Sequence, residues 1–355
     1  LGHQVVYLSV DTRFRRKRGH LGIHHNKINN VNVYNFVFIP LALLFFLPQS
    51  LKNYVYSFLY SRVFKQALRK EGNPDVMYAH YLGYINIALN FKKTTGIPIV
   101  GIEHWSELGK EEVKSNILTL AQQVYPHINQ LITVSNYLKS NIQRHLNIKN
   151  IEVVHNLVGK EFFYIPQNIH HTFTIISTGS LIHRKGFDLL ISALSKIDKH
   201  LPDDWRTIII GSGELKDALQ EQINNFNLQN NIYLVGQKNK DEIVHLLQRS
   251  DIFILPSRSE TFGVAYIEAM ACGLPIIATD CGGPKDIVKI ENGLLIPNED
   301  VDALGNAILY MVKNINRYDR KSIAEDCQIR FAPEVIAKRL TTIFEETIKT
   351  HKEQQ

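Results

Sequence analysis

The stretch from Asp251 to Pro275, DIFILPSRSETFGVAYIEAMACGLP, decides the fold. Its apolar run at residues 252–255 predicts a buried parallel strand, which Pro256 ends. A polar loop follows, and a helix is expected over residues 264–272, before Gly273. A strand, a Gly-containing turn and a helix start form an anion site, because the first helical N–H groups have no partner within the helix.

Two carboxylates flank this anion site. Glu260 belongs to the loop and Glu268 to the helix, so the segment suits a ligand with phosphates and several hydroxyls. A nucleotide sugar is such a ligand. The alternative is that both Glu are solvated surface charges, because two Glu at this spacing also occur by chance.

This stretch resembles the retaining glycosyltransferases of family 4. Their signature joins S-E-x-F-G to E-A-x-A-x-G-x-P, and residues 259–263 and 268–275 match both parts. The resemblance covers nearly the whole chain and implies the GT-B architecture, an α/β fold of two facing doubly wound, Rossmann-like domains. It implies that Glu260 is catalytic, that Glu268 holds the ribose, and that the donor also meets Thr261, Phe262, Gly263 and Val264.

A second segment places two cations, Arg184 and Lys185, after a predicted strand at residues 173–177 and just before a helix. Such cations can neutralise a diphosphate. The resemblance makes both of them catalytic candidates and adds Gly179 and Ser180 to the donor site. Ser180 stands where the family usually has Arg, so either Arg184 takes that role or diphosphate binding is weaker. Alternatively, the two cations are solvated charges at a helix start.

Two further turns resemble the family's nucleotide pocket. Gly211 and Gly213 follow a predicted strand at residues 206–210, and Gln237 follows one at residues 232–235. A lone G-x-G is weak by itself. The family recognises the base mainly with backbone groups, which do not reveal the base in the sequence. A UDP- or GDP-sugar is the expected donor.

The first half offers His104, which follows a predicted strand at residues 97–102 and resembles the family's acceptor-side His. A packed or surface His is the alternative. The opening LGHQVVYL is interpreted as the second strand of the first domain. On that interpretation, a first strand and its Gly-rich loop, about 20–30 residues, would precede it.

Apolar strands alternate with helical stretches along the chain, which predicts βαβ units and mainly parallel sheets. A polar stretch at residues 163–171 separates two expected domains. Residues 1–165 would bind the acceptor, and residues 166–355 would bind the donor, with a final helix able to pack back on the first domain.

Charge is unevenly divided. Residues 1–165 hold 19 Lys and Arg against 9 Asp and Glu, a balance of +10, whereas residues 166–355 hold 21 against 25, a balance of −4. The basic half, with its cluster at residues 13–18, suits an anionic membrane surface; no nucleic-acid motif accompanies it, and a solvated loop is the alternative. The apolar run at residues 36–47 is too short to span a bilayer and is expected to form a buried or half-buried helix, with membrane contact as the alternative.

Three cysteines without metal-ligand spacing favour a reducing compartment and buried thiols. The sequence therefore predicts a cytoplasmic glycosyltransferase, peripheral on the inner face of the cell membrane. Its expected acceptor is a glycan or lipid-linked intermediate of a cell-surface polysaccharide such as capsule or lipopolysaccharide. No metal or other cofactor is expected, because no Asp-x-Asp lies at a plausible strand end. The alternatives are a nucleotide-sugar epimerase of the same architecture and a catalytically inactive partner subunit.

Overall fold

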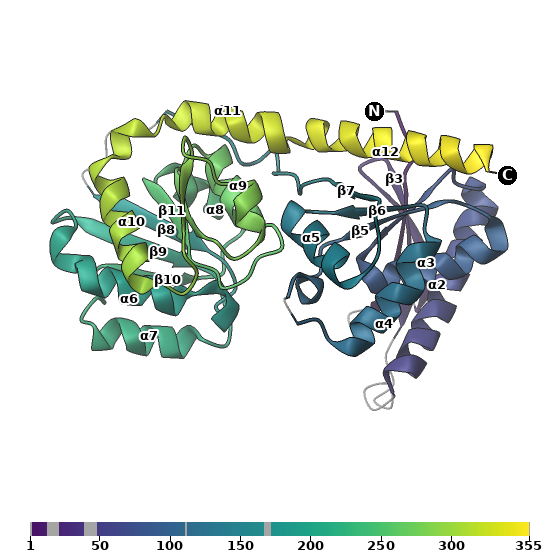
Figure 1. Cartoon of the computed structure of the whole chain (residues 1–355), viewed down its shortest axis with the longest axis horizontal. Helices are drawn as coiled ribbons and strands as arrows, with labels where there is room; N and C mark the ends of the chain where they lie inside the picture. Colours follow the sequence, from purple (N-terminus) through teal and green to yellow (C-terminus); the bar gives the residue numbers. More distant parts are fainter. Residues whose placement is uncertain (1, 13–20, 39–47, 111, 167–171, 355) are drawn as a thin grey trace. The chain divides into compact units, whose positions relative to one another are not determined.

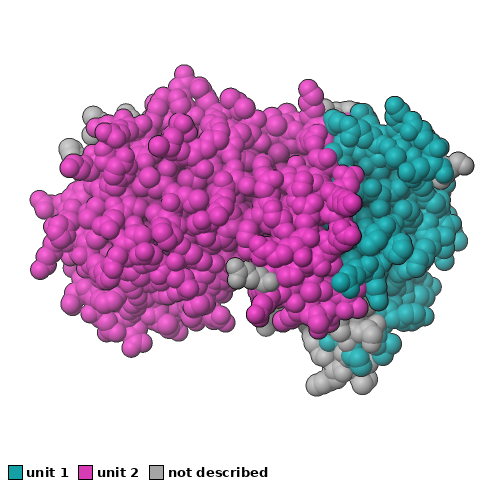
Figure 2. Space-filling model, in the orientation of Figure 1, with its two compact units in different colours: residues 1–102, 120–131, 342–355 teal, residues 103–119, 132–341 magenta. Residues whose placement is uncertain are grey.

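The computed structural model of the chain describes residues 2–12, 21–38, 48–110, 112–166 and 172–354. These residues form two compact units (Figure 2). The first comprises residues 1–102, 120–131 and 342–355, and the second comprises residues 103–119 and 132–341, apart from the positions outside the described ranges. No helix in the described part of the chain is long and apolar enough to cross a bilayer. The predicted domain boundary at residue 165 stays a prediction.

The first unit begins with a small mixed sheet of order β1-β3-β2. Strand β3 (Val31–Phe38) pairs in parallel with β1 (Val6–Thr12) and antiparallel with β2 (Gly22–Ile28). Asn29 and Asn30 join β2 to β3 with φ angles of 48° and 65°. Two consecutive residues with positive φ make the tight hairpin turn that Asn tolerates. This antiparallel hairpin departs from the mainly parallel pattern that we expected.

The predicted helix at residues 36–47 is wrong for its first three residues. Phe36, Val37 and Phe38 end β3, where they pair with β1 on one side and, in part, with β2 on the other. Aromatic and β-branched side chains favour a strand between two such partners. Residues 39–47 of this run, and the basic cluster at residues 13–18, lie outside the described residues.

Helix α2 (Gln49–Glu71) is the longest element of the first unit. Its inner face packs through Val63 and Ala67 against the buried Tyr34 of β3, and Phe64 stacks on Phe91 of α3 (Tyr81–Thr95) with ring centroids 4.3 Å apart. The Tyr34 hydroxyl donates to Glu71 over 2.6 Å. Burial, together with this acceptor, raises the pKa of Tyr34 to about 12. These contacts fix which side of α2 faces the core.

A second, four-stranded sheet has the order β4-β5-β6-β7. Its strands are β4 (Met77–His80), β5 (Ile99–Glu103), β6 (Gln130–Thr133) and β7 (Ile151–Val153). β4 and β5 run parallel, as predicted. The helices in this part of the chain are η1 (Ser106–Gly109), α4 (Ser115–Val124), η2 (Tyr125–His127) and α5 (Asn136–His145).

The second unit holds a six-stranded sheet of order β10-β9-β8-β11-β12-β13 with every neighbouring pair parallel. Residues 252–255 and 276–278 are wholly buried, as expected of strands covered on both faces. The predicted doubly wound α/β fold is therefore confirmed here. The strands are β8 (Phe173–Thr178), β9 (Trp205–Ile210), β10 (Ile232–Gly236), β11 (Ile252–Leu255), β12 (Ile276–Thr279) and β13 (Gly293–Ile296).

Helices cover both faces of this sheet (Figure 1). One layer joins α7, α6 and α10, since α6 packs beside both of the others; on the opposite side α9 packs against α11. The helices are η3 (His183–Lys185), α6 (Phe187–Ile197), η4 (Asp198–His200), α7 (Lys216–Asn225), α8 (Lys240–Gln248), α9 (Val264–Ala271), η5 (Gly283–Asp286), α10 (Val301–Lys313), η6 (Ile315–Arg317), α11 (Arg320–Phe331) and α12 (Pro333–Glu353).

Candidate functional site

Glu260 is the centre of the candidate site. It lies in the loop between β11 and α9, and its carboxylate is buried, with 7% of the side chain exposed. Lys185 Nζ donates to Oε1 over 2.5 Å, and Arg184 Nη1 lies 3.5 Å from Oε2. The Ser257 hydroxyl donates to Oε1 over 2.9 Å. The structure thus brings together three of the four predicted catalytic residues.

The loop after β8 reaches the loop after β11 through a close backbone approach. Gly186 has a φ of 69°, and a Cβ built on it would lie 1.9 Å from the Pro256 carbonyl oxygen. Only glycine fits that position. The backbone N–H of Arg258 donates to the Arg184 carbonyl over 2.8 Å, so the two loops meet at Arg184 as well as at Gly186. Parallel strands end at the same edge of the sheet, which explains why these loops meet.

Arg258 links the same two loops with its side chain. It donates to both carboxylate oxygens of Asp188, over 2.8 and 2.6 Å, and to the His183 carbonyl over 2.7 Å. Its Nε donates to Glu299 over 2.8 Å. Burial alone would raise the pKa of the Asp188 carboxyl, but the hydrogen bonds from Arg258 bring it below its usual value. Sequence reasoning missed Arg258; its position two residues before Glu260 was the available signal.

The backbone of Glu260 is also fixed. Gly283 N donates to the Glu260 carbonyl over 2.8 Å, and Glu260 forms a parallel bridge with Gly282. Three residues later Gly263, with a φ of 102°, caps α9, so the N–H groups at the start of that helix lie directly after the carboxylate. The predicted sequence of strand, turn and helix start is therefore confirmed.

Glu268, the second predicted carboxylate, lies on α9 and is half-buried. Burial raises the pKa of its carboxyl to about 7, the charge of Lys240 lowers it and the charge of Glu161 raises it. Lys240 Nζ itself donates to Glu161 over 2.5 Å, and this contact lowers the pKa of Glu161. Glu268 is thus a carboxyl that changes charge near neutral pH. The link from residue 161 to residue 240 has no sequence signal.

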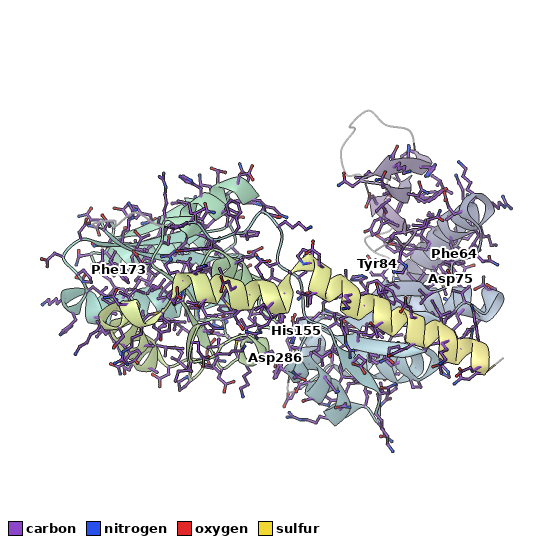
Figure 3. The ribbon with its side chains drawn as sticks, turned by 90° about the horizontal axis from the view of Figure 1, so that it is seen from above. Phe64, Asp75, Tyr84, His155, Phe173 and Asp286 are labelled. Carbon is purple, nitrogen blue, oxygen red and sulfur yellow. The ribbon has the colours of Figure 1, made fainter. Side chains whose placement is uncertain are left out.

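The ring of Phe262 packs instead of facing a ligand. It is 1% exposed and stacks on His155, with ring centroids 5.3 Å apart and an interplanar angle of 22°. Phe331 lies across both rings at 5.7 Å. The His155 ring Nδ1 lies 3.0 Å from the Val134 carbonyl. Because the Phe262 ring is buried in this cluster, the predicted sugar contact of Phe262 can involve only its backbone. Asp286, labelled with His155 in Figure 3, accepts a hydrogen bond from the Asn136 N–H over 2.6 Å.

The remaining donor-site candidates lie at strand ends of the same sheet. A Cβ on Gly211 would lie 1.8 Å from the Gly179 carbonyl oxygen, so the turns after β8 and β9 touch. Gly213 follows in the second of these turns. The side chains of Ser180 and Gln237 are exposed. Beside Glu260, Thr261 is half-buried and Val264, the first residue of α9, is 38% exposed.

His104 lies directly after β5, in the other sheet, and is half-buried. Its backbone N–H and that of Trp105 both donate to the Glu103 carboxylate over 2.9 Å. Glu103 is fully buried. Sequence reasoning passed over Glu103, which shapes the turn that carries His104.

Within the described residues, no three His, Cys, Asp or Glu side chains come together as a metal centre requires. The three cysteines are buried and unpaired. Burial raises the pKa of Cys272 to about 12 and that of Cys281 to about 11, so both thiols beside the site are protonated at neutral pH. They are inert packing groups, as predicted.

Two family models together match residues 1–325. "Glycosyl transferases group 1" matches residues 161–325, and "Glycosyltransferase Family 4" matches residues 1–162. Among curated proteins, an uncharacterized glycosyltransferase of Methanocaldococcus jannaschii is 30% identical over 75% of this chain and 72% of its own length.

A second relative carries a more specific name, the GDP-mannose-dependent monoacylated alpha-(1-6)-phosphatidylinositol monomannoside mannosyltransferase of Corynebacterium glutamicum. It is 28% identical over 49% of this chain and 47% of its own length. The chain thus aligns with less than half of that mannosyltransferase.

Solved structures share the fold. Sucrose-phosphate synthase from Thermosynechococcus elongatus superposes with a TM-score of 0.77 at 19% identity, over 96% of this chain and 89% of that one. Anabaena HepE, solved in complex with UDP and glucose, superposes with a TM-score of 0.72 at 19% identity, over 89% and 87%. These likenesses confirm the predicted GT-B fold.

Proposed function

Because this chain belongs to the family 4 glycosyltransferases (glycosyl transferases group 1), we propose that it moves a sugar from a nucleotide-diphosphate sugar to an acceptor hydroxyl. The reaction is retaining: the acceptor oxygen replaces the diphosphate at the anomeric carbon on the same face of the sugar. The anomeric bond to the diphosphate breaks, the nucleoside diphosphate leaves, and the proton of the acceptor hydroxyl passes to the departing phosphate oxygen.

One observation carries this proposal, the pairing of Lys185 and Arg184 with Glu260 beside the start of α9. Departure of a diphosphate builds negative charge, and two cations plus free helix-start N–H groups stabilise such charge electrostatically. The partly buried position of Lys185, with 15% of its side chain exposed, strengthens that effect because less water screens it. These groups serve where a metal ion would otherwise act, so the proposed transfer is metal-independent.

Glu268 is assigned to the ribose of the nucleotide. A carboxylate accepts hydrogen bonds from two vicinal hydroxyls, and α9 carries this one about one turn beyond the phosphate-binding end of the helix. Backbone groups at Gln237 and at the turns of Gly211 and Gly213 would contact the base and its surroundings. Either uridine or guanosine fits such backbone recognition.

The proposed acceptor is a lipid-linked intermediate of a cell-surface polysaccharide, met at the cytoplasmic face of a membrane. The balance of +10 in residues 1–165 supports an anionic surface as partner. The name of the Corynebacterium relative, a phosphatidylinositol mannoside mannosyltransferase, supports a lipid-borne acceptor. His104, at the end of β5, is the candidate contact to the acceptor hydroxyl.

A donor screen tests the proposal. The full-length protein is heated with UDP-, GDP- and ADP-sugars, and the melting temperature is recorded for the wild type and for Glu268→Ala. One nucleotide class should stabilise the wild type, and the variant should lose most of that stabilisation. The selected donor should then release nucleoside diphosphate in the presence of an acceptor glycolipid. No stabilisation by any nucleotide sugar would contradict the proposal.

A further inference from the structure

Helix α2 carries a continuous exposed face that none of the contacts above explains. One turn of an α-helix takes about 3.6 residues, so positions 51, 54, 58, 62, 65 and 69 fall within an arc of about 80°. All six side chains are exposed. We call this face the outer stripe of α2; its members are Leu51, Tyr54, Phe58, Arg62, Lys65 and Arg69.

The outer stripe is divided by chemistry. Its first half is apolar and aromatic: Leu51 is 44%, Tyr54 70% and Phe58 53% exposed. Its second half is entirely cationic. Arg62 joins the halves, because its guanidinium lies 5.5 Å from the centre of the Phe58 ring. Large exposed aromatic side chains on one helix face mark an interaction site.

The opposite face of α2 is already occupied. Val63, Phe64 and Ala67 are buried in the core of the first unit, so the helix cannot rotate to hide its outer stripe. Tyr60 of α2 also lies on this inner side, where its ring is 5.7 Å from that of Tyr84 of α3 (Tyr84 and Phe64 are labelled in Figure 3).

The charge of α2 selects the kind of partner. The helix contains five basic residues and a single acid, Glu71, which accepts hydrogen bonds from Gln4, Asn32 and Tyr34. Exposed aromatic side chains can enter the headgroup region of a bilayer, and Lys and Arg close to them attract its anionic lipids. With no spanning helix among the described residues, such contact would be made from the surface.

We infer that the outer stripe of α2 docks the protein on an anionic lipid bilayer. Leu51, Tyr54 and Phe58 enter the headgroup region, and Arg62, Lys65 and Arg69 contact lipid phosphates. This inference rests on the proposed function for its purpose, since docking would bring the first unit to a lipid-borne acceptor. It differs from the predicted role of residues 13–18 and 36–47, because it assigns the contact to described residues of one helix.

Vesicle co-sedimentation of the whole chain tests the inference. Vesicles of phosphatidylcholine with phosphatidylglycerol should bind the wild type at low salt, and pure phosphatidylcholine should not. Binding should fall steeply with added salt, because screening acts over ~10 Å at 0.1 M. Reversing Arg62, Lys65 and Arg69 to Glu should lower the partition coefficient about a hundredfold or more. Changing Tyr54 and Phe58 to Ser should lower it about tenfold.

A matched variant separates the stripe from net charge. Lys27, Lys70 and Lys93 are exposed cations of the same unit outside the stripe. Their joint reversal to Glu changes the net charge by the same amount and should leave binding within about threefold of the wild type. Equal losses in both triple variants, or a wild type that stays in the supernatant with anionic vesicles, would overturn the inference. Circular dichroism checks that each variant is folded.

Donor turnover is measured in the same samples without vesicles. The stripe variants should release nucleoside diphosphate at the wild-type rate, since α2 belongs to the first unit and the residues of the Glu260 site belong to the second. If the wild type turns over the donor but does not bind vesicles, the docking inference is wrong and the proposed transfer stands. If it binds vesicles but shows no turnover, the proposed transfer is wrong and the docking inference stands.

Discussion

Arg258 and Asp188 form a two-pronged ion pair, with Nη1 to Oδ1 at 2.8 Å and Nη2 to Oδ2 at 2.6 Å. Asp188 is in the first turn of α6, directly after the two cations, and Arg258 stands two residues before Glu260. The pair therefore fixes the distance between the cationic loop and the carboxylate loop. Only 14% of the Arg258 side chain is exposed. We assign Arg258 a positioning role.

Replacing Arg258 by Lys should lower turnover about tenfold to a hundredfold, because Lys keeps the charge but cannot form the two parallel bonds that align the loops. Steady-state kinetics of the Arg258→Lys and Asp188→Asn variants should show losses mainly in kcat. The double variant should lose little more than either single variant. Additive losses would show that the two residues act separately.

The control for this series is Arg249→Lys, an exposed arginine of the same unit. It should leave kcat, KM and the melting temperature unchanged. If both variants lost turnover to a similar extent, the loss in Arg258→Lys would reflect a general sensitivity of this domain to substitution and not the ion pair with Asp188.

Lys185→Ala should depress kcat about a hundredfold or more, because it removes the cation nearest to the leaving diphosphate. Affinity for the nucleoside itself should change much less. The exposed Lys196, paired with Asp302 on the surface, provides the matched control. If Lys185→Ala turns over the donor at close to the normal rate, Lys185 does not stabilise the leaving group and only holds Glu260 in place.

Nucleotide binding should weaken below neutral pH. Because burial raises the pKa of the Glu268 carboxyl to about 7, the group gains a proton as the pH falls and no longer offers a charged acceptor to the ribose. Affinity should drop about tenfold between pH 8 and pH 6. Calorimetry with a nucleoside diphosphate checks this. Glu268→Gln should bind weakly and show only the pH dependence of the ligand's own phosphate; an unchanged profile would refute the ribose assignment.

Activity should survive chelation by EDTA, because cations and backbone amides are assigned the task of charge stabilisation. Nucleoside diphosphate should be measured directly by chromatography, since coupling enzymes often need Mg²⁺ themselves. Complete loss of activity, followed by recovery on adding Mg²⁺ or Mn²⁺, would show that the leaving group needs a metal ion.

Local sequence patterns predicted most strands of the six-stranded sheet. The run at residues 252–255 became β11 without a shift, and the run at residues 206–210 became β9 with Trp205 added, because buried parallel strands are short apolar runs between turns. The hairpin of β2 and β3 was missed. Strand β2 is polar, with His24, His25 and Asn26 in a row, and residues 36–38 of β3 belong to the apolar run for which a helix was predicted. The Asn29-Asn30 turn was the only clear signal.

The site was predictable where residues lie at strand ends. Arg184, Lys185 and Glu260 follow β8 and β11, which are neighbours in the sheet, so their meeting follows from topology. The ion pairs of Arg258 with Asp188 and of Lys240 with Glu161 could not be predicted, because the partners are 70 and 79 residues apart and no periodicity connects them. The burial of the Phe262 ring likewise depends on His155 and Phe331, which come from distant segments.

The contact between Lys185 and Glu260 means that an anion can reach this cation only by replacing a carboxylate. The cation is already satisfied by a fixed carboxylate, so an incoming anion must displace that partner. A small monovalent anion such as chloride would exchange one contact for a weaker one and leave Glu260 buried without its cation, which is unfavourable. A diphosphate can satisfy Lys185 and Arg184 together. Glu260 is therefore expected to compete with an incoming anion for both cations, and a diphosphate, which offers more charge and more acceptor oxygens than a monovalent ion, competes better.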